Sequence, residues 1–189
     1  MLTTLWILAV AAALVIAIVL ILAAAKPDSF HVERSTAIAA PPERILPLIT
    51  DFRNWRSWSP YEKLDPALKR TLSGAESGKG AVYEWQGNRK AGQGRMKIAS
   101  ASPSRIAIDL HFLKPFRGHN LAEFRLEPQD GLTRITWSMD GKRPFMLKIM
   151  HTIFNMDRMI GKDFEAGLAN LKAVAENRPP EQRPGDVRA

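Results

Sequence analysis

The sequence predicts an α+β fold in which a long C-terminal helix covers one face of an antiparallel sheet, with one transmembrane helix before this domain. Three features carry the prediction: an uncharged apolar segment at the N-terminus, strands of alternating polarity in the middle, and helical periodicity near the C-terminus. The expected organisation is a transmembrane helix at residues 1–25, a connector at 26–29, the folded domain at 30–176 and a disordered tail at 177–189.

The N-terminal 25 residues contain no charged side chain. A helix of this length crosses a hydrocarbon core of roughly 30 Å. A cleaved signal peptide is the alternative, because Ala23 to Ala25 resemble a small-residue cleavage site. No Lys or Arg precedes the apolar segment, however, and the segment exceeds the usual apolar core of about 7–15 residues. A retained membrane anchor is therefore the favoured interpretation.

Basic residues lie on one side of this segment only. None precedes it, whereas Lys26, Arg34 and Arg44 follow it. Because positively charged flanks stay in the cytoplasm, this asymmetry favours a single-pass protein of a bacterial inner membrane with a cytoplasmic domain.

Seven segments are expected to form the sheet. Residues 30–38 are rich in β-branched side chains, and later segments alternate apolar with polar residues, separated by turn residues such as Pro128 to Gly131. One apolar and one polar face per strand is typical of an antiparallel sheet covered on one side. The six later segments are residues 68–72, 81–85, 94–99, 106–112, 120–127 and 133–140.

Two short helical segments are expected after the first strand. Pro42 suits the first turn of a helix over residues 43–50, although Pro47 strains its middle. Asp51 is a plausible N-cap for a second segment over 51–58.

The covering helix is expected to begin at Pro144. Apolar residues recur from Ile149 to Leu171 at spacings of three and four, which predicts one long amphipathic helix across the concave face of the sheet. Gly161 and Gly167 lie inside it and indicate either close backbone packing or space left for another molecule.

Four motifs occur in the order found in one family. They are Ile38-x-Ala40-Pro41-Pro42-Glu43 with Asp51-Phe52-x-x-Trp55-x-x-Trp58-Ser59-Pro60, then Gly78-x-Gly80-x-x-Tyr83-x-Trp85-x-Gly87, then Gly131-Leu132-Thr133-Arg134-Ile135-Thr136-Trp137, and finally Phe154-x-Met156-Asp157-x-Met159-Ile160-Gly161-x-Asp163-Phe164-x-x-Gly167-Leu168. Over residues 30–176 the chain thus resembles the SRPBCC (START-like) superfamily, in particular its polyketide cyclase/dehydrase group.

The resemblance implies a helix-grip fold, with a hydrophobic cavity between a curved sheet and the long C-terminal helix. Family members include lipid carriers, hormone receptors and aromatic polyketide cyclases. Such a fold supports ligand binding better than any one chemistry.

The predicted cavity residues are those on the apolar side of the strands and of the long helix. The alternative is that these side chains fill an ordinary core, and that alternative stays open. The expected lining is Met96, Ile108, Phe112, Asn120, Phe124, Trp137 and Met139 from the sheet and Met156, Ile160 and Phe164 from the helix, with Trp58 and Trp85 at the rim.

No set of residues predicts catalysis, a metal site or a cofactor. The chain lacks Cys, which excludes thiol nucleophiles and disulfides, and its four His residues show no metal-binding spacing. His111 and His119 are expected to face solvent, while His31 lies near the connector and His151 on the long helix. Among polar residues, only Asn120 and Arg34 are candidates for a role in a cavity.

The net charge of +8 is concentrated in the strand region. Between Lys69 and Arg117 there are ten basic and three acidic residues. A basic face near a membrane attracts anionic headgroups, although a solvated surface has the same composition. Nucleic-acid binding is not expected, because no stacking aromatics alternate with the basic residues on an exposed strand.

Three functions are consistent with the sequence. The leading hypothesis is a membrane-anchored protein that binds a lipid or other hydrophobic small molecule, with unknown protein partners. The alternative is a cyclase or dehydratase that acts on a polyketide-like substrate. A third is an interaction protein with a filled core and no ligand.

Overall fold

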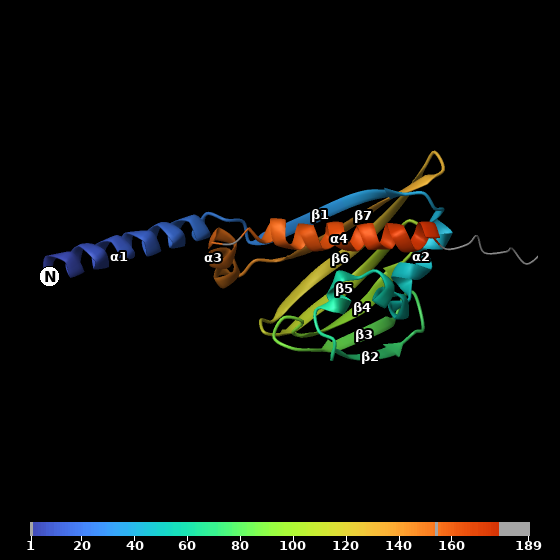
Figure 1. Ribbon diagram of the computed structural model, residues 1–189, viewed down its shortest axis with the longest axis horizontal. Coiled ribbons are helices and arrows are strands. Elements are labelled where there is room, and N and C mark those ends of the chain that lie inside the picture. Colours follow the sequence, from blue (N-terminus) through green and yellow to red (C-terminus); the bar gives the residue numbers. More distant parts are fainter. Residues whose placement is uncertain (1, 154, 178–189) are drawn as a thin grey trace, which may run out of the picture.

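The computed structural model describes residues 2–153 and 155–177, and Figure 1 shows their arrangement. The predicted α+β architecture is confirmed: seven strands form one sheet, and a long helix lies across it. The elements are α1 (Leu2–Ala24), β1 (Ser29–Ile38), α2 (Pro42–Thr50), η1 (Phe52–Ser57), η2 (Pro60–Lys63), β2 (Lys69–Gly74), β3 (Ala81–Gln86), β4 (Gln93–Ala101), β5 (Arg105–Lys114), β6 (Gly118–Gln129), β7 (Leu132–Lys142), α3 (Phe145–Ile153) and α4 (Met156–Asn177).

Helix α1 projects away from the rest of the molecule (Figure 1). Its segment Thr3–Ala24 is long and apolar enough to cross a membrane, and a signal sequence has the same properties. Only the C-terminal end of α1 contacts the domain, where Ala23 is buried and α3 packs beside it. Most of the other α1 side chains that the structure describes are exposed.

The sheet is antiparallel throughout, in the order β1-β7-β6-β5-β4-β3-β2. Its register brings the apolar residues of successive strands into rows on the concave face. One such row runs from Val32 on β1 through Met139, Ala122 and Ile108 to Ile98 on β4. All five are buried, because α4, α2 and η1 cover this face.

The short helices form as predicted. Helix α2 has Pro42 in its first turn and accommodates Pro47. The Asp51 carboxylate accepts a hydrogen bond from the backbone N–H of Arg53 and so caps η1.

The prediction of one continuous helix from Pro144 is wrong. Two helices, α3 and α4, replace it, because Asn155 starts a new helix. Its side-chain oxygen accepts a hydrogen bond from the N–H of Arg158 at 3.0 Å, which is the geometry of an N-cap. The expected tail at 177–189 begins with Asn177, which closes α4, and residues 178–189 lie outside the described part.

Two glycines allow α4 to approach the sheet closely. A Cβ atom at Gly161 would collide with the guanidinium group of Arg34, and one at Gly167 would lie 2.7 Å from the indole of Trp137. Of the two explanations offered by the sequence, close packing therefore accounts for both positions.

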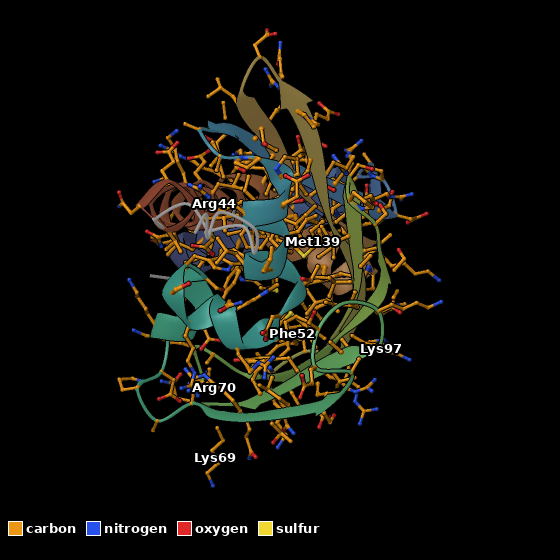
Figure 2. All side chains as sticks on the ribbon, turned by 90° about the vertical axis from the view of Figure 1, so that its right-hand side faces the viewer. Arg44, Phe52, Lys69, Arg70, Lys97 and Met139 are labelled. Carbon is orange, nitrogen blue, oxygen red and sulfur yellow. The ribbon has the colours of Figure 1, made fainter. Side chains whose placement is uncertain are left out.

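Aromatic rings fill the part of the interior farther from α1. Trp137 stacks on Phe164 with ring centroids 4.1 Å apart and on Phe124 at 5.0 Å, and Trp58 meets Phe124 and Trp137 edge to face. In Figure 2, Met139 lies inside, between sheet and helices, whereas Lys69 points outward. The concave face is therefore solidly packed around this aromatic cluster.

Candidate ligand-binding site

A pocket of about 380 Å³ lies at the end of the domain next to α1. The connector, the start of β1, the end of β7 and the junction of α3 with α4 form its walls. Its apolar lining is Phe30, Val32, Ile153 and Ile160, and its polar lining is Lys26, His31, Arg143, His151, Thr152, Asn155 and Asp157.

Two contacts of Asp28 fix the connector against the domain. Its carbonyl oxygen accepts a hydrogen bond from the N–H of Arg143 at 2.6 Å, and its carboxylate lies 2.6 Å from Nζ of Lys148. The hydrogen bond and charge of Lys148 lower the pKa of Asp28. The pocket wall thus joins segments more than a hundred residues apart in the sequence.

The pocket has a positive electrostatic character. Burial, followed by the positive charges of Arg143 and Lys26, lowers the pKa of His151. Within the part of the chain that the structure describes, neither Lys26 nor Arg143 has a salt bridge, and the Nε atom of Arg143 is buried without a hydrogen-bond partner. This edge of the pocket is suited to an anionic group.

Arg34, one of two polar residues singled out in the sequence, links β1 to α4. Its guanidinium lies 2.8 Å from Glu165 and 3.4 Å from Asp157, and also donates to the carbonyl of Glu33. The hydrogen bond with Glu165 makes the largest contribution to raising its pKa. With these partners Arg34 is engaged in holding α4 over the sheet.

Asn120, the other polar candidate, faces the concave side nearer to α1. Gly141 leaves room for it: a Cβ atom there would collide with the amide and lie 2.6 Å from the ring of Phe30. Its Nδ2 lies 3.6 Å from the sulfur of Met139, a weak acceptor. The amide therefore retains capacity to bind another group.

The structure separates the predicted cavity residues into three groups. Ile160 lines the 380 Å³ pocket, and Phe112 and Asn120 are half-buried at the same end of the concave face. The side chain of Met156 lies outside what the structure describes. The remaining residues are buried in the core cluster: Met96, Ile108, Phe124, Trp137, Met139 and Phe164.

The two tryptophans expected at the rim differ from each other. Trp58 is not at a rim: it is only 1% exposed, because its indole N–H donates to the carbonyl of Leu48 at 2.8 Å and its ring joins the aromatic cluster. Trp85 is half-buried, donates to the carbonyl of Ala91 and covers Gly94, where a Cβ atom would collide with its ring.

The pocket residues Lys26 and Arg143 were not predicted from the sequence. Lys26 is the first charge after α1, and Arg143 directly follows β7. Because β1 begins beside the end of β7 in an antiparallel pair, the sheet order of the structure places both at one end. The sequence shows each residue as a charge at the end of a predicted element, but not the strand pairing that joins them.

Two groups of ionisable residues that include η2 side chains were not predicted either. Glu62 is paired with Arg70 at 2.6 Å and accepts a hydrogen bond from the hydroxyl of Tyr83 at 2.5 Å. Burial raises the pKa of Tyr61, to which the charge of Asp163 adds, and burial raises the pKa of Asp163. Their signal in the sequence is weak, because these residues belong to four different elements, η2, β2, β3 and α4, which no local pattern joins.

Comparison with known proteins agrees with this geometry. The family model described as polyketide cyclase / dehydrase and lipid transport matches residues 29–176. The chain belongs to this family. The resemblance in the four motifs is thereby confirmed, whereas no curated protein matches the chain.

Solved structures with low sequence identity share the family fold. CV1439 from Chromobacterium violaceum is 15% identical with a TM-score of 0.56, over 81% of this chain and 100% of its own. The Aha1 dimer from Colwellia psychrerythraea is 15% identical with a TM-score of 0.57, over 78% and 97%. DynU16, from the dynemicin biosynthetic locus, is 17% identical with a TM-score of 0.54, over 80% and 48%. These likenesses establish the fold alone.

Proposed function

We propose that this protein is a membrane-tethered module that binds a lipid or other hydrophobic small molecule between its sheet and α4. The observation that carries the proposal is the uneven filling of the concave face. Aromatic rings pack the part farther from α1, while a pocket of about 380 Å³ opens at the end next to α1. This volume falls within the range of small-molecule sites.

Half-buried apolar side chains also lie beyond the pocket, at the same end of the sheet. Phe30 and Ile160 line it, and Trp85 and Phe112 are partly exposed at the same end of the sheet. With Asn120 as a polar group among them, this surface is suited to a mainly apolar ligand. Of the predicted cavity residues, Ile160 lines the pocket, and Phe112, Asn120 and Trp85 lie at the same end of the sheet. In the proposed binding mode, the buried Met96 and Met139 contact a ligand only after a small outward movement of their side chains.

Exposed apolar residues around this end support contact with a membrane. Helix α3, which packs against the end of α1, exposes Phe145, Met146 and Ile153. The β5–β6 turn lies at the same end of the sheet (Figure 1) and exposes Phe116, which is 59% exposed, between Lys114 and Arg117. Apolar and basic side chains together favour binding to an anionic lipid surface.

The proposed location is the cytoplasmic face of a bacterial inner membrane, with α1 retained as the anchor. Support comes from the basic residues that follow α1 and from the absence of any before it. A retained α1 also explains why Ala23 is buried against α3, since a domain that loses the segment before Ala25 would lose this contact.

Filling the pocket tests the binding proposal. Ile160→Trp adds volume where the pocket is lined, whereas Met159→Trp places the same ring on the exposed side of the same helix. We expect the native mass spectrum of the detergent-extracted full chain to contain a hydrophobic molecule, which Ile160→Trp loses and Met159→Trp retains. A chain free of any such molecule, and unable to take up added lipid, would contradict the proposal.

A cyclase or dehydratase activity is the second candidate, and one observation favours it. Tyr61 of η2 lies near Asp163 of α4, and burial raises the pKa of both groups, so a phenol and a carboxyl group are available for proton transfer at this edge of α4. If this pair acts on a bound substrate, Tyr61→Phe and Asp163→Asn abolish turnover and leave ligand uptake unchanged. Equal turnover in both variants and the parent would exclude the pair.

A further inference from the structure

The pocket next to the connector has chemically different sides. Phe30, Val32 and Ile160 supply an apolar surface, and Lys26 and Arg143 supply positive charge. A purely apolar ligand would leave these charges without a partner. Hydrophobic binding alone therefore does not explain the basic side of the pocket.

The nearby acids are already engaged by other side chains. Asp28 pairs with Lys148 at 2.6 Å, and Asp157 pairs with Arg34 at 3.4 Å. Asp140 lies 2.8 Å from the ring of His31. In the described chain this leaves Lys26 and Arg143 as pocket cations without an acidic partner.

Arg143 provides the most specific indication. Its Nε atom is buried, and no acceptor lies within hydrogen-bonding distance in the described chain. Buried donors of this kind are rare in folded proteins and normally meet an acceptor oxygen. A guanidinium group is well matched to the oxygens of a phosphate or a carboxylate.

We propose that this pocket binds the anionic headgroup of an amphiphile, with phosphate or carboxylate oxygens at Arg143 and Lys26 and the adjoining apolar part against Phe30, Val32 and Ile160. This inference rests on the proposed hydrophobic-ligand function and specifies the class of ligand. The lowered pKa of His151 agrees with it, because the two cations that cause part of that shift are those that an anion would neutralise.

The position of Lys26 indicates where such a ligand would come from. Lys26 is the second residue after α1, so in the tethered protein it lies at the depth of the lipid headgroups. A membrane lipid then reaches the pocket without crossing water. A soluble anionic amphiphile has the same chemistry and is distinguished by experiment.

The test is native mass spectrometry of the full chain in a non-ionic detergent, titrated with phosphatidylglycerol or phosphatidylcholine that carry the same acyl chains. We expect about tenfold preference for phosphatidylglycerol, lost in Arg143→Gln and in Lys26→Gln. Lys142→Gln, which removes an exposed charge beside Arg143 but outside the pocket lining, is the matched control and retains the preference. Inorganic phosphate is added as a competitor to test recognition of the headgroup alone.

The outcomes separate this inference from the function on which it rests. Equal binding of both lipids, unchanged by either substitution, would overturn the headgroup site and leave hydrophobic binding intact. Binding of neither lipid would remove both proposals. If Arg143→Gln fails to fold, as judged by circular dichroism, Lys26→Gln decides, because in the described structure the Lys26 side chain makes no salt bridge that the substitution would break.

Displacement of phosphatidylglycerol by inorganic phosphate indicates a site that binds the headgroup oxygens and also accepts soluble anions. Resistance to phosphate, with the lipid preference retained, indicates that the acyl part is also required and points to a membrane lipid. A second readout is the imidazole titration of His151 by NMR, whose pKa is expected to rise when phosphatidylglycerol binds. No change in that titration on binding would contradict the placement of the anion beside His151.

Discussion

Phe164 and Trp137 stack face to face under α4, with their rings 7° from parallel, and both side chains are almost fully buried. Around them Trp58 and Phe124 complete a cluster held by ring contacts and by the indole hydrogen bond of Trp58. The indole N–H of Trp137 is buried without a partner in the described chain, so this residue is held by packing. We therefore expect these residues to contribute strongly to the stability of the domain.

Truncating one ring tests this at the level of the residue. Phe164→Ala removes the ring that stacks on Trp137 and is expected to lower the free energy of unfolding by about 3–5 kcal/mol. Met159→Ala, on the exposed side of the same helix, is expected to change it by less than about 0.5 kcal/mol. Urea titration followed by tryptophan fluorescence measures both. A small effect of Phe164→Ala would show that the cluster is loosely packed.

Protonation of His151 is expected to make the stability of the domain depend on pH. Burial, Arg143 and Lys26 lower its pKa below 6.5, and His31 and Asp157 are the other titratable groups that line the pocket. Below about pH 6.5 the unfolded chain takes up a proton that the folded chain resists, so stability falls as the pH falls. We expect a lower urea midpoint at pH 5 than at pH 7.5 and a smaller difference in His151→Gln. An identical difference in the variant would contradict this assignment.

At the scale of single residues, the sequence predicted the direction of side chains better than their surroundings. The alternation of β5 to β7 correctly turned Ile108, Phe124 and Trp137 inward, because strand geometry sets that parity. It could not place Trp58, whose burial depends on the carbonyl of Leu48 in α2. Nor could it show that Asn155 divides the C-terminal helix, since apolar periodicity continues on both sides of the break.

Among the elements, α3 exposes apolar side chains that packing within the domain does not explain. It packs against the end of α1, its Lys148 is tied to the connector, and it exposes Met146, which is 65% exposed. A short helix with one side on the domain and apolar side chains on the other is typical of a helix lying in a membrane interface. Because α3 lies next to the pocket, the proposed lipid contact and the proposed ligand access would involve the same element.

The absence of Cys makes this contact measurable. Met146→Cys, labelled with an environment-sensitive fluorophore, is expected to report an apolar environment when the full chain is inserted in lipid nanodiscs. Leu132→Cys, at the start of β7 and at the opposite end of the sheet, is the exposed control and is expected to report water. Equal emission from both sites would show that α3 does not contact lipid.

The pocket is a feature that the pattern of single elements does not predict. Lys26, His31, Arg143 and His151 belong to a connector, a strand, a linker and a helix, and no local pattern joins them. Their proximity follows from the pairing of β1 with β7 and from the hydrogen bond between Arg143 and Asp28. The predicted cavity residues came instead from regular periodicity, which identifies buried surfaces and not the gaps between them.

For the whole molecule, the direction of insertion is the main prediction. With positive residues only after α1, the domain is expected in the cytoplasm. Leu132→Cys serves again: a membrane-impermeable maleimide is expected to label it in bacterial cells only after the inner membrane has been permeabilised. Labelling in intact spheroplasts would place the domain on the outer side of that membrane.

Only four residues separate α1 from β1, and Asp28 among them is bonded to both Arg143 and Lys148. Four extended residues span at most about 14 Å, so a domain held by α1 in a membrane, as proposed, would have little freedom to move away from it. A carrier built in this way would not shuttle across an aqueous compartment to a distant bilayer. Its ligand would be exchanged within its own leaflet or passed to a recipient that comes to it.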